Sequence, residues 1–249
     1  MTGTLLRRDS QVLTQDFSEN EVFFCPEESH FYSHCLERLV FSQCSDSNFV
    51  VEFGSGDGTP VINALMRSRF NSIVYGYELN PSAYDVARAR IAQCNLNRKY
   101  VIHNESFFDA VRPKASYLIA NPPYIPAPDN QICMPLLHGG CDGGGITNQL
   151  LTLGYDHVMV LVSSYSNPVN TIHCALKQGY SVADFMLTPL KFGYYSSEPK
   201  VKQCITEMRQ KQQAFYSDQI YFLAGVLFRR RTLSKVDLSD ELTQVMTAL

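Results

Sequence analysis

The tetrapeptide Asn121-Pro122-Pro123-Tyr124 combines residues that are suited to holding a planar nitrogen group. The two prolines lack N–H donors, so the backbone there offers carbonyl oxygens that only accept hydrogen bonds. The amide oxygen of Asn121 is a further acceptor, and the ring of Tyr124 offers a face on which a flat group can stack. Two acceptors on one –NH2 group would orient its lone pair toward an electrophile, so positioning would supply most of the catalysis.

A turn with three alternating glycines follows an apolar run that contains the acidic Glu52. Its G-x-G-x-G spacing differs from the G-x-G-x-x-G pattern that seats a pyrophosphate on a helix. The carboxylate also favours a cationic or amino-bearing ligand, and S-adenosylmethionine carries positive amino and sulfonium groups. We therefore expect this cofactor to be bound by Glu52, Gly54, Ser55, Gly56 and Gly58.

Two further loops carry acidic residues at the spacing that such a cofactor needs. Glu78 ends the next apolar run, where a carboxylate can accept hydrogen bonds from both ribose hydroxyls. Glu105, with Ser106 beside it, can accept a hydrogen bond from an adenine amino group. Phe107 or Phe108 either covers that ring or belongs to the core, and the sequence leaves both interpretations open.

Short β-branched runs alternate with helical stretches, which predicts an α/β fold whose parallel sheet is covered by helices on both faces. In such sheets ligands bind beyond the carboxyl ends of the strands, where the loops above would meet. The last two strands lack an intervening βαβ helix, so we expect a mostly parallel seven-stranded sheet with an antiparallel edge. The predicted strands are 48–53, 73–78, 100–103, 116–120, 157–163, 181–187 and 219–229, and the predicted helices are 59–70, 81–94 and 168–178.

Three segments lie around this core. We expect residues 1–47 to form an N-terminal segment, residues 48–231 the main domain, and residues 232–249 a tail helix. Residues 190–218 interrupt the last two strands and contain a possible helix at 198–215. Loops at this edge could either reach the ligand crevice or be a solvated excursion. Thr59, Asn80 and Asn167 are expected to cap their helices.

Composition limits the function classes. The net charge of −3 lacks the positive excess of proteins that grip long nucleic acids. No apolar run approaches the length of a membrane span, and the N-terminus lacks a signal-peptide core, so we expect a cytoplasmic protein without a membrane partner. None of the eight cysteines forms a C-x-x-C pair. The nearest approach to a metal cluster is His138 with Cys141 and Asp142, and we expect no metal there.

The run VVEFGSGDG, the spacing to Glu78 and the Asn-Pro-Pro-Tyr motif together resemble the Rossmann-like class I S-adenosylmethionine-dependent amino-methyltransferases. Among these, the chain looks most like the HemK-type protein-glutamine methyltransferases. Residues 138–144 are similar to the glycine-rich loop that follows the motif in that family. Residues 24–31 are similar to its upstream Pro-x-Glu-Asp-Thr segment, and the resemblance spans about residues 21–162.

The resemblance implies roles for individual residues. Asn121 and the Pro122 carbonyl would hold the target amide, and Tyr124 would stack on it. Pro26, Glu28 and Ser29 would form a lid over the methionine end of the cofactor. The implied activity is transfer of a methyl group from S-adenosylmethionine to a protein glutamine.

Other acceptors and one other class of function remain open. An exocyclic amine of RNA has the same flat shape as an amide, whereas duplex DNA would require base flipping and an added recognition region. A small-molecule acceptor is also compatible with the motif. A non-catalytic cofactor-binding subunit is the alternative outside catalysis, and the sequence does not determine the oligomeric state.

Overall fold

The computed structural model describes residues 22–44, 49–233 and 235–249, so the predictions for residues 1–21 and 45–48 lie outside the described residues. Within these ranges the strands form one sheet in the order β3-β2-β1-β4-β5-β8-β6, and β7 pairs with β8 beside this path. The strands are β1 (Val50–Phe53), β2 (Val74–Tyr77), β3 (Tyr100–His103), β4 (Tyr117–Ala120), β5 (His157–Ser163), β6 (Tyr180–Lys191), β7 (Tyr216–Ser217) and β8 (Ile220–Arg230).

The sheet confirms the predicted fold class. Strands β1 to β5 pair in parallel, whereas β8 runs antiparallel between β5 and β6. All seven predicted strands are present, and the two-residue β7 adds an eighth that the sequence analysis missed. Strand β6 extends beyond its predicted end to Lys191, because it keeps pairing with β8 along that strand's whole length.

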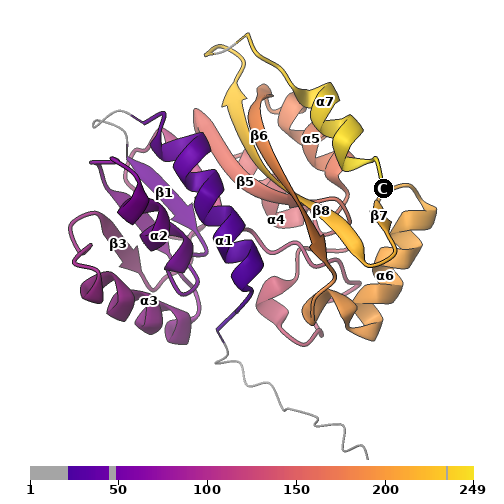
Figure 1. The fold of residues 1–249 in the computed structure, drawn as a ribbon, viewed down its shortest axis with the longest axis horizontal. Coiled ribbons are helices and arrows are strands. Elements are labelled where there is room, and N and C mark those ends of the chain that lie inside the picture. The colour runs from indigo at the N-terminus through magenta and orange to yellow at the C-terminus, as the bar shows by residue number, and fades with distance from the viewer. Residues whose placement is uncertain (1–21, 45–48, 234) are drawn as a thin grey trace, which may run out of the picture.

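Helices cover both faces of the sheet (Figure 1). Val158, Val160 and Val162 of β5 pack into one apolar cluster, and Met159 and Leu161 pack into the other. This alternation follows from the two-residue period of a strand. The helices are α1 (Pro26–Cys35), the π-helix η1 (Leu36–Phe41), α2 (Thr59–Arg67), α3 (Pro81–Gln93), the 3-10 turn η2 (Pro135–Leu137), α4 (Gly145–Leu151), α5 (Pro168–Lys177), the 3-10 turn η3 (Tyr195–Ser197), α6 (Pro199–Gln210) and α7 (Ser239–Met246).

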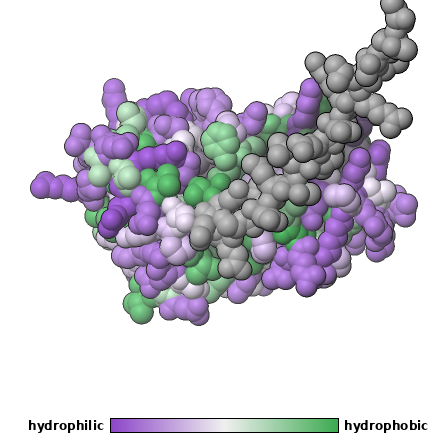
Figure 2. All heavy atoms as spheres, turned by 90° about the horizontal axis from the view of Figure 1, so that it is seen from below, coloured by the Kyte–Doolittle hydropathy of each residue, from purple (hydrophilic) through white to green (hydrophobic). Residues whose placement is uncertain are grey.

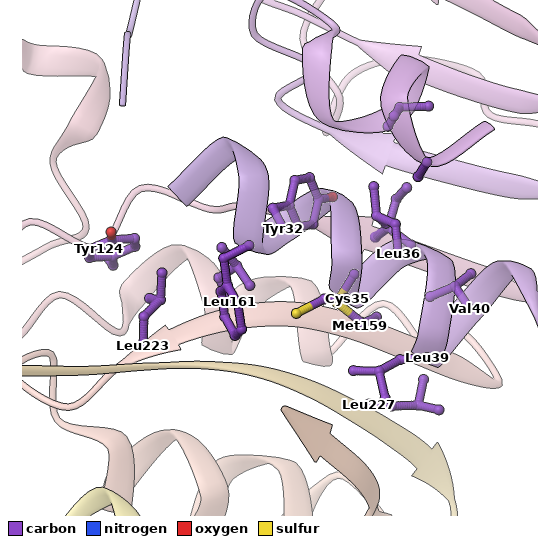
Figure 3. Packing of buried hydrophobic residues seen from close by; sticks show 14 of the residues in the cluster. Tyr32, Cys35, Leu36, Leu39, Val40, Tyr124, Met159, Leu161, Leu223 and Leu227 are labelled. Carbon is purple, nitrogen blue, oxygen red and sulfur yellow. The ribbon is translucent and has the colours of Figure 1, made fainter. Parts of the chain in front are cut away.

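Helix α1 and its π-helical continuation η1 were not predicted as helices, yet they form much of one core. Figure 3 shows Cys35 of α1 beside Met159 of β5, and Leu39 of η1 beside Leu227 of β8. Met159 and Leu227 are fully buried, and burial of one such side chain stabilises the fold by about 1.5–3 kcal/mol. Helix α1 and η1 are therefore packed into the same core as the sheet.

The predicted helix caps were partly right. The Asn80 side chain accepts hydrogen bonds from two backbone N–H groups at the start of α3, which confirms it as a cap. Thr59 is not a cap, because Gly58 occupies that position in a left-handed conformation and the Thr59 N–H donates to Asp57. Asn167 stands at the cap position of α5, but its side chain donates to Asp142 at 2.8 Å instead.

The tail contains a helix as expected, although α7 is shorter than the predicted segment. It packs its Leu242 and Met246 against the cluster that also contains β5 and α5 residues. Helix α4 was not predicted. None of the helices in the described ranges has the length and apolar character needed to cross a bilayer.

Candidate functional site

One cavity of about 800 Å³ opens where β1, β2 and β4 end. It brings together loops that are far apart in the sequence, as the parallel sheet predicts. Of the residues predicted to act in the site, ten line it: Glu28, Gly54, Gly56, Glu78, Glu105, Ser106, Asn121, Pro122, Pro123 and Tyr124. Five do not: Pro26, Ser29, Glu52, Ser55 and Gly58.

The glycine turn after β1 leaves an open cradle. Gly54 and Gly56 have φ of +68° and +53°, a left-handed conformation that glycine adopts without strain. A Cβ atom added to either residue would meet no atom within 4 Å, so both backbones face free space. A ligand can therefore lie directly against the main chain of this turn.

Glu78 fixes that turn from the end of β2. One of its carboxylate oxygens accepts from the Gly56 N–H at 2.7 Å, and the other accepts from the Asn80 N–H at 2.8 Å. Burial raises the pKa of Glu78, and these backbone hydrogen bonds act in the opposite direction. Each oxygen keeps a second lone pair, so the carboxylate can still accept from ribose hydroxyls while it holds the loop.

Glu52 does not line the cavity. Its side chain is buried and accepts a hydrogen bond from the Tyr100 hydroxyl. Burial raises the pKa of Glu52 to about 8, and the Tyr100 hydrogen bond partly offsets this effect. The predicted contact between Glu52 and the cofactor stays a prediction, because the observed partner of this carboxylate is Tyr100.

The loop after β3 supplies one wall of the cavity. Glu105 is half exposed, and its carboxylate lies 3.9 Å from the His103 ring nitrogen. Phe107 is buried in the core while it also lines the cavity, and its ring packs edge-on against Tyr77. Phe107 therefore belongs to the core, and its role as a cover for the adenine ring stays a prediction. The adenine role of Glu105 and Ser106 stays a prediction.

The glycine-rich loop that contains Gly139 holds the Asn-Pro-Pro-Tyr motif in place. The Gly139 N–H donates to Ile125 at 2.9 Å, and a Cβ atom on Gly139 would lie 2.7 Å from both the Pro123 carbonyl oxygen and the Tyr124 Cα atom. Ser166 also donates to the Tyr124 carbonyl at 2.7 Å. Only glycine permits this close approach, so the loop acts as a support for the motif.

His138 and Asp142, which the sequence places nearest to a metal cluster, have other hydrogen-bond partners. The His138 ring lies 3.0 Å from the Ala127 carbonyl oxygen, and Asp142 accepts from Gly144 and Asn167. These contacts give His138 and Asp142 a structural role around the motif.

At the motif itself, polar acceptors face one another across a buried space. The Asn121 amide oxygen is buried and has no hydrogen-bond partner among the described residues, and the same holds for one carboxylate oxygen of Glu28. Tyr124 is buried, and its ring lies 5.8 Å from that of Tyr165. Such unpartnered buried acceptors are costly in an apolar setting, so a ligand with N–H donors would fit between them.

Sequence reasoning missed most of the apolar rim of the cavity. Phe24, Leu136 and Tyr194 are largely exposed and line its mouth. Figure 2 shows apolar surface between polar regions on the underside of the molecule. Residues 189–196, which could have been a solvated excursion, line the cavity instead. The aromatic residues of this stretch were the sequence signal for a place in the cavity, but only the long antiparallel pairing of β6 with β8 brings them to it.

The charge of the lining is mainly acidic. Among the described residues that line the cavity there are four glutamates, whereas Lys191 is the one lysine or arginine. A site that grips phosphates carries several cations. This lining therefore favours an uncharged or cationic group over a nucleic-acid backbone.

The chain matches no known family model and no curated protein. Solved structures are similar in fold. PH1948 of Pyrococcus horikoshii, a candidate RNA methyltransferase, is 12% identical with a TM-score of 0.54 over 82% of this chain and 83% of that one. PH0793 from the same organism, a candidate transferase, is 10% identical with a TM-score of 0.51 over 84% and 66%. The [4+2]-cyclase SpnF is 9% identical with a TM-score of 0.50 over 81% and 80%.

These likenesses establish the fold. The chain has the Rossmann-like architecture of class I methyltransferases, in agreement with the prediction from the sequence. The names of PH1948 and SpnF describe different reactions, so the shared fold does not by itself assign a reaction to this chain.

Proposed function

We propose that the protein is an S-adenosylmethionine-dependent N-methyltransferase whose acceptor is the planar side-chain amide of a protein glutamine. The observation that carries the proposal is the buried, unpartnered amide oxygen of Asn121 in the same cavity as the open glycine turn and Glu78. One end of the cavity fits the cofactor, and the other fits a flat donor group.

The residues at the cofactor end fit the group. The exposed backbone of Gly54 and Gly56 can lie against its methionine portion, and Glu78 can accept from the ribose hydroxyls. When bound, S-adenosylmethionine supplies an electrophilic methyl group on a sulfonium. Phe107 and Phe53 give the cavity an apolar wall, which excludes water around a flat ring.

At the acceptor end, the protein binds and orients a nitrogen. The Asn121 amide oxygen and the Pro122 carbonyl can each accept one N–H of the acceptor, while Tyr124 supports its plane. Tyr124 is fixed by Ser166 and by Gly139 behind it. Holding the nitrogen in one orientation lowers the entropic part of the barrier.

The acidic lining favours a protein acceptor over RNA, because phosphates would be repelled by Glu27, Glu28, Glu78 and Glu105. The exposed apolar rim suits the side chains that flank a target residue in a peptide. RNA, a small molecule and a non-catalytic role are the competing outcomes of the experiment below. A cytoplasmic location and the division at residues 47 and 231 are part of this proposal and rest on the sequence.

The test uses purified protein, methyl-labelled S-adenosylmethionine and a cell lysate divided into protease-treated and ribonuclease-treated portions. We expect the label to survive ribonuclease and to be lost with protease, and mass spectrometry of the labelled protein to locate methylation on a glutamine. Label lost with ribonuclease would assign RNA as the acceptor. Label that survives both enzymes would assign a small molecule. No label with intact cofactor binding would assign a non-catalytic subunit.

A further inference from the structure

Glu28 is an acidic residue in the first turn of α1, and it is buried. It is 8% exposed, and its Oε2 atom has no hydrogen-bond partner among the described residues. It lines the same cavity as Asn121 and Tyr124, and both act on its carboxyl as hydrogen-bonding neighbours. The resemblance placed this residue over the cofactor, whereas the fold places it against the motif that holds the acceptor.

The groups around Glu28 come from four elements, and none of them is a cation. Cys25 and Glu27 lie beside it at the start of α1, and Asn121 and Tyr124 face it from the loop after β4. Tyr165, after β5, and Tyr221 of β8 also feel its charge.

A buried carboxylate without a cationic partner destabilises a fold. The backbone N–H groups at the start of α1 do not compensate for the burial of Glu28, because its Oε2 atom accepts none of them. Proteins retain such groups where a ligand completes the hydrogen bonding.

We propose that the Glu28 carboxylate is a further acceptor for the target nitrogen and receives the proton that this nitrogen loses. This inference rests on the proposed function. In the step, the N–C bond to the methyl group forms and the S–C bond of the sulfonium breaks, leaving a neutral thioether. The N–H electron pair stays on nitrogen, and the proton passes to Oε2 of Glu28. Charge and atoms balance without another reactant.

The environment suits this proton transfer. Burial raises the pKa of Glu28, and the neighbouring Tyr124 and Asn121 only partly offset it. A base with a pKa raised toward the working pH is better matched to proton transfer than an exposed carboxylate. Below that raised pKa the carboxyl is neutral, so the rate of transfer should rise as the pH increases through it.

The experiment compares Glu28→Gln with Glu207→Gln, which changes an exposed glutamate on α6. Four quantities are measured: kcat on the labelled acceptor, its pH profile, the Kd of S-adenosylhomocysteine by calorimetry, and Tm. We expect Glu28→Gln to lower kcat by about 100-fold or more and to remove the acidic limb of the pH profile. The Kd should change less than two-fold, and Tm should not fall, because a buried charge is removed. Glu207→Gln should change none of the four.

Three results would overturn the inference. One is an unchanged kcat and pH profile in Glu28→Gln, and another is a loss of activity that a matching loss of S-adenosylhomocysteine affinity explains. The third is a fall in Tm that accounts for the lost activity. If the wild-type protein labels RNA, only the glutamine acceptor of the proposed function fails, and the same comparison is made on RNA. If it labels nothing, both proposals fail.

Discussion

The two ends of the cavity contain buried carboxylates in opposite states. At the cofactor end, both oxygens of Glu78 accept backbone N–H groups and hold the glycine turn. At the acceptor end, Glu28 and Asn121 keep buried oxygens without partners among the described residues. The difference indicates that the cofactor end is shaped by the protein itself, whereas the acceptor end is completed by the donor groups of its ligand.

The sharpest way to break this comparison is Asn121→Ala. We expect kcat to fall by about 100-fold or more, the range seen when one positioned hydrogen-bonding group is lost from an active site. The Kd of S-adenosylhomocysteine should stay within two-fold, because the substitution lies at the acceptor end. Single-turnover kinetics and calorimetry measure the two quantities. A fully active variant would remove the acceptor role of Asn121.

Glu78→Ala tests the other end. Loss of a charged hydrogen-bonding group should weaken S-adenosylhomocysteine binding by about 1.5–3 kcal/mol, which corresponds to roughly 10- to 150-fold in Kd. Glu105→Ala serves as a comparison, because its half-exposed carboxylate should contribute less. Calorimetry measures the Kd of S-adenosylhomocysteine for both variants. Equal losses of affinity would contradict the distinction between the buried and the exposed carboxylate.

The smallest expected effect concerns Glu52, the buried carboxylate that accepts a hydrogen bond from the Tyr100 hydroxyl. Its pKa of about 8 in the folded protein lies above the ordinary glutamate value of 4.5. Its contribution to stability is therefore fully present below about pH 4.5 and is lost as the pH rises to about 8. We expect Glu52→Gln to gain Tm relative to the wild type over this window, by about 2 °C or more near pH 8. Melting curves at pH 5 and pH 8 measure it, and a constant difference would contradict the raised pKa.

Much of the cofactor end was accessible from the sequence, because its signals are local. The strand residues 50–53 lead directly into the glycine turn, and Asn80 with Pro81 begins α3 as predicted. The Asn-Pro-Pro-Tyr motif could also be recognised from the sequence, because consecutive prolines restrict the backbone wherever they occur. Patterns of this kind depend on neighbours in the chain and not on the rest of the fold.

The start of α1 was less accessible. Residues 26–35 carry a weak helical pattern with polar and apolar side chains on several sides, and the helix packs on α2 and β6 with its apolar side chains in the core. The eighth strand, β7, has only two residues and pairs with Ile220 and Tyr221 of β8, just before the stretch of β8 that pairs with β5. Both α1 and β7 therefore depend on tertiary contacts, which a local sequence pattern does not contain.

The sequence by itself determined the order of strands and helices, the flexible glycine turn and the acceptor-rich motif, because these follow from backbone restrictions and side-chain periodicity. Only the tertiary structure decided that Glu28 lies beside Asn121, that the Tyr100 hydroxyl donates to Glu52, and that residues 189–196 line the cavity. The direction of a side chain depends on which strands pair and how helices pack against them, and distant parts of the chain meet only when the sheet has formed.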